Sequence, residues 1–437
     1  MARVVIDITP LRRHRDFRRL WAGQVVSGVG SQLTLVAVSY QAYALTHSTL
    51  VVGLTGLVQL VPLLGGALLG GALLGGTLAD AMDRRRVLVI TQFAMAAASG
   101  GLVINATLPH PRVWPLFVCT AAAAAFQGVD WPARRATLPM VVDPDEVIAA
   151  VALQTTIQQL ALVVGPALAG ILISTIGLGA VFGVDVATFG VALVVALLLP
   201  ALVPSGGGTP MGFRSMAEGF SHLKGQKLLS ATYWIDLNAM IFGMPRAVFP
   251  ALGVGLFGGG AAVVGLLYAA PGAGALIGSL FTGWCSRVRH QGRAIAACVA
   301  VWGTTIALFG IIPVLWISLA LLALAGAADV ISAVFRQAVQ QRTVPDHLQG
   351  RLSGTFFAVV AGGPRLGDAE TGLAAEVGGP QFAVWSGGLV CVIGVALLLW
   401  RVPELWRDSG GGDQLSPGAA DRAIAETTSE LGEGEPL

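Results

Sequence analysis

A chain of 437 residues that is 55% hydrophobic and only 11% charged is not a soluble globular protein, in which about 25% of the residues are charged. A mean hydropathy of +0.75 indicates a protein embedded in a lipid bilayer. The formal net charge of +2 is small and the basic residues are dispersed, which excludes a nucleic-acid partner. The four cysteines show neither metal-ligand spacing nor a disulfide framework, so neither a metal nor a cofactor is expected.

Apolar stretches of about 20 residues, the length that crosses a bilayer as a helix, recur along the whole chain. Glycine, proline and charged residues mark where each stretch ends. The sequence therefore predicts an all-α polytopic membrane protein with twelve transmembrane helices, at residues 18–45, 49–79, 87–108, 112–139, 147–176, 178–203, 229–256, 260–286, 293–312, 314–340, 350–377 and 381–402.

Arginine and lysine residues gather at one set of helix ends. The predicted loops on the other side of the membrane contain only Arg112. Because an excess of lysine and arginine marks the cytoplasmic side, both termini are expected in the cytoplasm of a multi-pass plasma-membrane protein, which in a bacterium is the inner membrane. Residues 1–17 form the predicted cytoplasmic tail, and the apolar run that follows is too long for a cleavable signal peptide.

A hydrophilic stretch at residues 204–228 divides the chain. It begins with glycine and proline, and residues 213–229 have the periodicity of a short amphipathic helix. We expect a cytoplasmic linker between an N-terminal six-helix half, residues 18–203, and a C-terminal six-helix half, residues 229–402. Residues 403–437 are rich in glycine, glutamate and serine and are predicted to form a disordered cytoplasmic tail.

The loop at residues 76–86 reads Gly-Thr-Leu-Ala-Asp-Ala-Met-Asp-Arg-Arg-Arg. It resembles the loop between the second and third helices of the major facilitator superfamily, although Ala81 and Asp83 replace the usual arginine and glycine. A merely positive cytoplasmic loop would explain the arginines but not the residues before them. The resemblance implies the major facilitator fold, with two pseudo-symmetric six-helix halves. It also implies that four charged residues take part in gating at the cytoplasmic face: Asp80, Arg84, Arg85 and Arg351.

The predicted fifth helix contains Gly165-Pro166-Ala167-Leu168-Ala169-Gly170. This sequence resembles a motif of proton-coupled exporters in the same superfamily, with Ala169 in place of one glycine. Proline removes a backbone donor, and small residues let a neighbouring helix approach closely. Glycine and proline are also common in membrane helices without a special role. The resemblance implies export and assigns Gly165, Pro166 and Gly170 to the motif.

Charged residues inside a membrane helix are costly, at about 2.5–3.5 kcal/mol near its centre. Asp130 with Arg134, and Asp329 with Arg336, occupy corresponding positions in the two halves. We interpret them as gating ion pairs, with static buried pairs as the alternative. Asp185 has no obvious partner in the sequence, and we interpret it as a residue that serves packing or helix polarity.

Two further sets of charged residues belong to the C-terminal half. Asp236 and Arg246 are nearly three turns apart on the predicted seventh helix and should face similar directions. In the predicted eleventh helix, a Gly-Gly-Pro sequence before Arg365 predicts a break or kink near mid-membrane. Arg365 is three residues before Asp368, close enough for a local pair, which is purely structural in the simpler interpretation. The predicted substrate and proton site consists of Asp236, Arg246, Arg365, Asp368 and Glu370.

The transmembrane region as a whole resembles the branch of the major facilitator superfamily that holds siderophore (enterobactin) exporters and transmembrane secretion effectors. The similarity rests on Phe17–Trp21, Thr46–Thr49, Pro132–Pro139, Gly243–Pro250, Gly265–Pro271, Gly350–Ser353 and Gly362–Asp368. It implies proton-coupled export of a siderophore or another bulky metabolite by alternating access. Macrolide or multidrug efflux, and a non-transporting membrane sensor, are alternatives within the same fold.

Other classes of function fit the sequence less well. A channel needs repeated polar rings along a pore, whereas this chain has two asymmetric halves. The six histidines form no metal pattern and no phosphate-binding loop is present, so an enzyme and an ATP-driven pump are not expected. The expected partners are a small-molecule substrate, protons and the lipid bilayer, and the expected state is a monomer.

Overall fold

The computed structural model of the chain describes residues 7–75, 83–202, 226–344 and 346–407. Every element in these residues is helical, as predicted, and they contain no strand. The predicted linker with its amphipathic helix lies outside the described residues up to residue 225, and the predicted disordered tail, residues 403–437, lies outside them from residue 408. Its first residues, Pro403–Arg407, form a short helix with Leu405 fully buried, so the tail begins later than predicted. The residue bounds of the two halves and of the linker stay predictions.

Twelve helical segments of membrane-spanning length follow one another in the described part of the chain, in the predicted order. Eleven are single helices: α2 (Arg15–Thr46), α3 (Thr49–Gly75), α4 (Arg84–Thr107), α5 (Trp114–Val141), α6 (Val147–Ile176), α7 (Leu178–Leu197), α11 (Gly260–Leu280), α12 (Gln291–Ile311), α13 (Leu315–Thr343), α14 (Asp346–Gly378) and α15 (Pro380–Arg401). The other is divided into α9 (Lys227–Phe242), η2 (Arg246–Val248), α10 (Phe249–Ala251) and η3 (Leu252–Leu256). Short helices at the ends of the long ones are α1 (Thr9–Arg13), η1 (Pro144–Glu146), η4 (Thr282–Arg287) and α16 (Pro403–Arg407).

Nine of the described segments are long and apolar enough to cross a membrane by length and composition alone. The long helices that do not meet this criterion are α2, α5 and α14. Each of them turns polar side chains toward the interior, such as Gln32 on α2, Gln127 on α5 and Arg365 on α14. Their lower apolar content therefore reflects an inward polar face, which is where membrane proteins keep polar residues.

The outside of the helix bundle is apolar. Val61, Leu280 and Trp400 are each 77% exposed, and many other large apolar side chains are exposed as well. Apolar patches of this extent are rare on soluble monomers. They are expected where the helices contact lipid chains.

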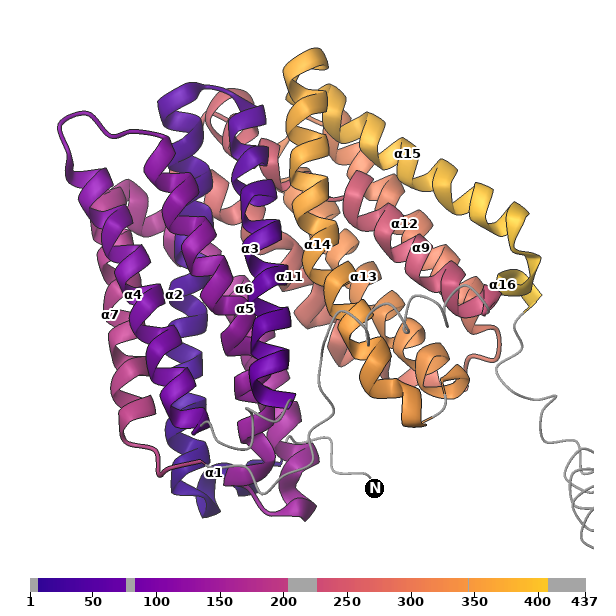
Figure 1. The fold of residues 1–437 in the computed structure, drawn as a ribbon. Helices are drawn as coiled ribbons and strands as arrows, with labels where there is room; N and C mark the ends of the chain where they lie inside the picture. The colour runs from indigo at the N-terminus through magenta and orange to yellow at the C-terminus, as the bar shows by residue number, and fades with distance from the viewer. Residues whose placement is uncertain (1–6, 76–82, 203–225, 345, 408–437) are drawn as a thin grey trace, which may run out of the picture.

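The helices form two bundles that lie side by side (Figure 1). One bundle consists of α2 to α7, drawn in indigo to magenta, and the other of α9 to α15, drawn in pink to yellow. The bundles contact each other along two seams, where α3 packs on α14 and where α6 packs on α11. This is the arrangement of two six-helix halves that the sequence predicted.

Both seams are built from glycines that allow close contact. A Cβ atom on Gly53 of α3 would lie 2.3 Å from the backbone oxygen of Asp368, and one on Gly265 of α11 would lie 2.7 Å from the Cα of Gly170. Gly53 and Gly265 belong to the first turns of their helices, and Gly170 to the last turns of α6. The halves are therefore joined toward one end of the bundle, opposite the end where α2 begins.

The seventh transmembrane segment is broken, whereas the sequence predicted one helix over residues 229–256. The helix α9 ends at Phe242, and regular structure resumes as a 3-10 turn at Arg246 followed by a short α-turn and a π-helical turn. Pro245 and Pro250 explain the irregularity, because each lacks the backbone donor that a continuous helix needs and clashes with the preceding turn. The break places Arg246 at an irregular point inside the bundle.

Of the break or kink predicted in the eleventh helix, the break is absent, and a kink stays a prediction. Helix α14 continues from Asp346 to Gly378 with Pro364 inside it. Its glycines instead permit a close approach to α9, since a Cβ atom on Gly367 would lie 2.2 Å from the backbone oxygen of Met240. Packing against a neighbour explains these glycines, and the interpretation as a helix break was wrong.

Candidate functional site

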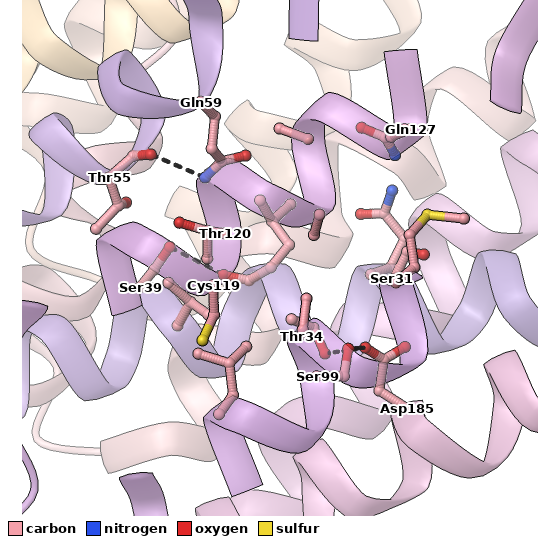
Figure 2. Close-up of a pocket in the computed structure, with 18 of the residues that line it drawn as sticks. Ser31, Thr34, Ser39, Thr55, Gln59, Ser99, Cys119, Thr120, Gln127 and Asp185 are labelled. Carbon is pink, nitrogen blue, oxygen red and sulfur yellow. Dashed lines mark hydrogen bonds between the residues drawn. The ribbon is translucent and has the colours of Figure 1, made fainter. Parts of the chain in front are cut away.

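A cavity of about 240 Å³ lies between the two halves. Figure 2 shows hydroxyl and amide side chains from α2, α3, α4 and α5 converging on it, with Asp185 of α7 at one edge. From the other half, Arg246 and Arg365 complete its wall. The polar side chains of the N-terminal half that line it are Ser31, Gln32, Thr34, Ser39, Thr55, Gln59, Ser99, Thr120, Gln127 and Asp185.

Three further hollows adjoin this cavity and share lining residues with it. One of about 220 Å³ contains Arg246, Arg365 and Asp368, and one of about 360 Å³ extends from Arg246 to Trp302 and Asp329. A third, of about 320 Å³, shares Ser31, Gln32 and Gln127 with the first and leads to Asp130 and Arg134. Together they form a region of adjoining hollows in the interior, lined by both polar and apolar side chains.

Arg246 and Asp368 form an ion pair at the centre of this region. The Nη2 of Arg246 lies 2.9 Å from Oδ2 of Asp368, and its Nε lies 3.3 Å from Oδ1. Tyr268 donates its hydroxyl to the backbone oxygen of Arg246 at 2.9 Å, which fixes the irregular turn that carries the arginine. Two contacts from one guanidinium to one carboxylate make a strong and oriented interaction.

The predicted local pair between Arg365 and Asp368 is therefore wrong. The Nη1 of Arg365 donates instead to the backbone oxygen of Ala361 at 2.7 Å, and its buried Nε has no hydrogen-bond partner. The broken seventh segment brings Arg246 to both oxygens of Asp368, so Arg365 is left without a carboxylate among the described residues. A guanidinium with free donors on a cavity wall is suited to bind an oxygen-rich or anionic group.

Asp236 does not join this cluster, contrary to prediction. It lies 2.8 Å from Nη1 of Arg336 on α13, and Nη2 of the same arginine lies 3.5 Å from Asp329. The seventh segment bends between Asp236 and Arg246, so the helical periodicity that predicted a common direction does not apply. The predicted contact of Asp329 with Arg336 is present, and Asp236 is its additional, more buried member, with 5% of its side chain exposed against 43% for Asp329.

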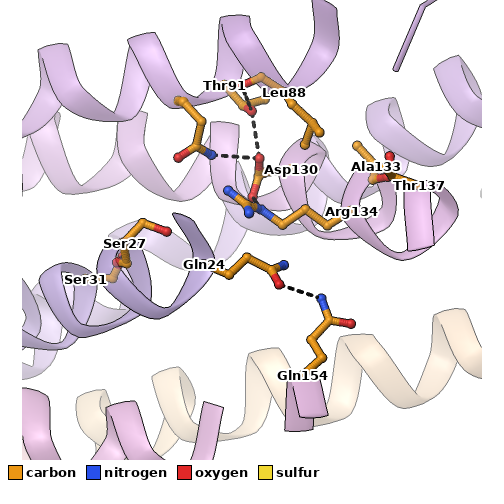
Figure 3. Close-up of polar contacts among 11 residues, drawn as sticks. Gln24, Ser27, Ser31, Leu88, Thr91, Asp130, Ala133, Arg134, Thr137 and Gln154 are labelled. Carbon is orange, nitrogen blue, oxygen red and sulfur yellow. Dashed lines mark hydrogen bonds and ion pairs between the residues drawn. The ribbon is translucent and has the colours of Figure 1, made fainter. Parts of the chain in front are cut away.

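The corresponding pair in the N-terminal half is also present. Arg134 donates its Nε to Asp130, and Thr91 and Gln92 of α4 donate to the same carboxylate at 2.8 and 2.9 Å (Figure 3). The carboxylate is thus held by three side chains from two helices. This pair lines the hollow that leads away from the central cavity, and its role in gating stays a prediction.

The arginines that open α4 bind backbone carbonyls of neighbouring helices. Arg84 donates to the oxygen of Ala136 in α5, and Arg85 donates to the oxygen of Leu197, the last residue of α7, at 2.5 Å. A cation at carbonyls near the end of a helix is stabilised by the helix dipole. Asp80 lies outside the described residues, and Arg351 belongs to α14 with its side chain outside them, so their predicted contact stays open.

The glycine–proline motif of α6 lies between two neighbouring helices. A Cβ atom on Gly165 would lie 2.3 Å from the Cβ of Gln32 on α2, and one on Gly170 would lie 2.7 Å from the backbone oxygen of Ala261 on α11. Pro166 lines the hollow of about 360 Å³. The motif therefore combines close packing at the seam with a position next to the cavity.

Two acidic residues differ from their sequence-based interpretation. Asp185, for which no partner was predicted, accepts hydrogen bonds from Thr34 and Ser99 and lines the central cavity. Its partners are hydroxyls on other helices, and a hydroxyl residue in an apolar helix carries no signal of what it binds. Glu370 accepts a hydrogen bond from the adjacent Thr371 at 3.3 Å and is not among the lining residues of the four hollows.

The chain is similar to known proteins over most of its length. A family model described as a transmembrane secretion effector matches residues 6–418. Enterobactin exporters of Shigella boydii and Escherichia coli are 29% identical to it over 396 residues, or 90% of this chain and 94% of each relative.

Solved structures share the fold at low sequence identity. The nucleoside transporter NupG superimposes with a TM-score of 0.67 at 12% identity, covering 90% of this chain and 98% of that one. A bacterial homologue of the iron transporter ferroportin, in an inward-facing state, gives a TM-score of 0.64 at 16% identity, covering 88% and 98%. At these identities the similarity concerns the fold alone.

Proposed function

Because the chain belongs to the transmembrane secretion effector family of the major facilitator superfamily, we propose that it is a proton-coupled exporter of a siderophore resembling enterobactin. The chain is a multi-pass membrane transporter of a small molecule, and the relatives given above are named as enterobactin exporters of bacteria rather than as enzymes. Protons as the coupling ion, alternating access, a monomeric state and cytoplasmic termini are further parts of the proposal.

The guanidinium of Arg365, which lines the central cavity and has no carboxylate partner among the described residues, is the observation that carries this proposal. Asp368 is already engaged by Arg246, so Arg365 keeps donors for a substrate. The phenolic oxygens of a catecholate siderophore are acceptors of the kind that a guanidinium fork holds. The amides of Gln32 and Gln59, which line the same cavity, can both donate and accept hydrogen bonds, which suits a substrate with many hydroxyl and amide groups.

Alternating access requires contacts between and within the halves that form and separate in turn. The seams at Gly53 and at Gly170 with Gly265 are suited to closing one end of the cavity. The ion pairs of Asp130 with Arg134, and of Arg336 with Asp236 and Asp329, are proposed as gating contacts nearer the other end. We assign Asp80, Arg84, Arg85 and Arg351 to the same gating group.

The test uses an Escherichia coli strain that lacks its own enterobactin exporter. The wild-type chain is expected to restore enterobactin in the medium, measured by chromatography. Arg365→Ala should lower secretion roughly tenfold, equivalent to about 1.4 kcal/mol, and Arg365→Lys should fall between the two because it keeps the charge but loses the fork. All variants are compared at equal abundance in the membrane.

The outcomes separate the functions that share this fold. Restored enterobactin secretion that depends on Arg365 supports the proposal. Resistance to erythromycin without enterobactin secretion would identify macrolide efflux instead. If the chain reaches normal abundance in the membrane but shows neither activity, export of both substrates is contradicted. A sensor of the same fold is then the function that agrees with the result.

A further inference from the structure

Asp185 differs from the other buried membrane carboxylates in having no arginine. Asp130 and Asp236, the other two carboxylates that are buried in the described membrane helices, each lie within ion-pair distance of an arginine, as does the partly buried Asp368. Asp185, in the middle of α7, is only 1% exposed, and the described residues provide it with hydrogen bonds but no salt bridge. An ionised carboxylate in such a place needs compensation for the water that it has lost.

The hydrogen bonds of Asp185 are unequal between its two oxygens. Thr34 of α2 and Ser99 of α4 both donate to Oδ2, at 2.7 and 2.6 Å (Figure 2). Among the described residues, the one hydrogen-bonding group near Oδ1 is the hydroxyl of Thr188, at 3.4 Å, and that hydroxyl donates at 2.7 Å to the backbone oxygen of Asp185. Since a hydroxyl has one hydrogen, Oδ1 lacks a good donor, whereas a proton on Oδ1 would find a lone pair on Thr188.

The absence of a side chain at Gly30 of α2 leaves room for Oδ1 of Asp185. A Cβ atom on Gly30 of α2 would lie 2.6 Å from Oδ1 of Asp185 and 2.0 Å from the hydroxyl oxygen of Thr188. Any side chain at position 30 would therefore push into the carboxylate. Asp185, Thr34 and Ser99 also line the central cavity, which supplies a polar route by which a proton reaches the group.

Few other ionisable groups face this position. The helices that pack on α7 are α2, α4 and α6. Their sequences contain no charged residue over Leu20–Thr46, Val87–Thr107 or Val147–Ile176, and the titratable groups there are Tyr40 and Tyr43. Across the cavity the lining includes Cys119 of α5 and the two guanidinium groups of Arg246 and Arg365.

We propose that Asp185 holds the coupling proton, bound at Oδ1 and directed toward the hydroxyl oxygen of Thr188. This assignment rests on the proposed function in so far as the proton drives export. The assignment places proton binding and substrate binding in different halves. The proton binds on α7 of the N-terminal half, and the substrate binds at Arg365 on α14 of the C-terminal half.

The hydroxyls of Thr34 and Ser99 connect the proton to the substrate. While Asp185 is ionised, their hydrogens point at Oδ2, and their lone pairs are left to accept hydrogen bonds from hydroxyl groups of a substrate in the cavity. When Asp185 is protonated, its Oδ2 becomes a weaker acceptor, and the hydroxyls of Thr34 and Ser99 can rotate away from it. Binding of a proton at Asp185 and binding of substrate at these hydroxyls then disfavour each other, which is the coupling that exchange requires.

The proton is tested directly by infrared spectroscopy on the purified full-length protein without substrate. As the pH is lowered, the carboxylic acids of the wild type should give C=O stretching bands, and the difference between the spectra of the wild type and Asp185→Asn should show one band that belongs to protonated Asp185. Asp329→Asn is the matched control and should retain the band. Thr188→Val, which removes only the acceptor for the proton, should keep the band and move it to higher frequency. The last variant keeps the test valid if Asp185→Asn fails to fold.

Absence of this band from the difference spectrum at every pH would overturn the assignment. The titration is repeated with sodium chloride replaced by choline chloride. A band that sodium abolishes would assign the site to Na⁺ rather than to a proton and would equally overturn the proposal.

A transport measurement connects the site to coupling. In proteoliposomes loaded with enterobactin, Asp185→Asn should lose transport driven by a pH gradient and keep exchange at equal pH. If this variant transports enterobactin at the wild-type rate under a pH gradient, Asp185 does not take part in coupling. If enterobactin is not transported by the wild type at all, the proposed substrate fails while the infrared result stands on its own.

Discussion

Arg246 and Asp368 are 122 positions apart in the sequence, yet the guanidinium contacts both oxygens of the carboxylate, at 2.9 and 3.3 Å. The arginine sits on the irregular turn of the seventh segment. The carboxylate belongs to a turn of α14 against which Gly53 and Gly56 of α3 pack. One ion pair thus links the broken segment, the cavity wall and a seam between the halves.

The first prediction concerns this pair. Arg246→Ala and Asp368→Asn each leave one charge without its partner, and breaking a buried pair costs about 3–5 kcal/mol, less where the pair is partly exposed. Both variants are expected to lower the melting temperature of the purified protein and to reduce enterobactin transport. The exchanged variant, Arg246→Asp with Asp368→Arg, should recover part of the lost thermal stability. Melting of both single variants at the wild-type temperature would show that the pair contributes little.

The second prediction compares two carboxylates that contact the same arginine. Asp236 is nearly buried and lies 2.8 Å from Arg336, whereas Asp329 is far more exposed and lies 3.5 Å away. Asp236→Asn should therefore reduce thermal stability and transport much more than Asp329→Asn, because an exposed pair contributes only about 0–1 kcal/mol. Equal effects of the two substitutions would contradict the exposure and distances on which this ranking depends.

The third prediction concerns the seam between α6 and α11. Gly170→Leu places a large side chain where a Cβ atom alone would lie 2.7 Å from the oxygen of Ala261, and overpacking of this kind costs about 1–3 kcal/mol. We expect lower stability and transport in this variant. Gly183→Leu on α7 is the control, because nothing lies within 4 Å of a Cβ atom there. A control variant that melts earlier than Gly170→Leu would be inconsistent with this packing.

The fourth prediction concerns orientation in the membrane. Single cysteines are introduced at His110 and at Arg289, two exposed positions in loops at opposite helix ends, after replacement of the four native cysteines. A membrane-impermeant thiol reagent applied to intact cells should label the cysteine at 110 and not the one at 289, because the arginine-rich ends belong in the cytoplasm. Labelling of the cysteine at 289 and not of the one at 110 would show that the protein has the opposite orientation in the membrane.

The twelve segments were predictable because bilayer crossing imposes a length of apolar sequence, and helix ends such as Thr49, Val147 and Leu178 agree with the structure. The local pair of Asp130 and Arg134 was predictable for a similar reason, since four residues make one turn of a helix. Arg246 and Asp368 were both identified as site residues from the cost of placing charge in a membrane.

The partners of these charges were not predictable from one sequence. Helical periodicity predicted that Asp236 and Arg246 face similar directions, because the segment between them was treated as one continuous helix in spite of Pro245. Gly363 and Pro364 were assigned a break that α14 does not have, since a glycine that serves close packing looks the same in sequence as one that ends a helix. Asp185 was missed because its partners are three hydroxyls, two of them on other helices.

We propose above all that the protein exports the substrate bound in its central cavity in exchange for protons. The most direct measurement is uptake of enterobactin into inside-out membrane vesicles whose lumen is made acidic in the absence of ATP. The wild-type chain should accumulate enterobactin only while the pH gradient lasts, a protonophore should abolish accumulation, and Arg365→Ala should accumulate roughly tenfold less. Accumulation at the same rate with the gradient collapsed, or none with the gradient intact and the protein present in the membrane, would contradict the account.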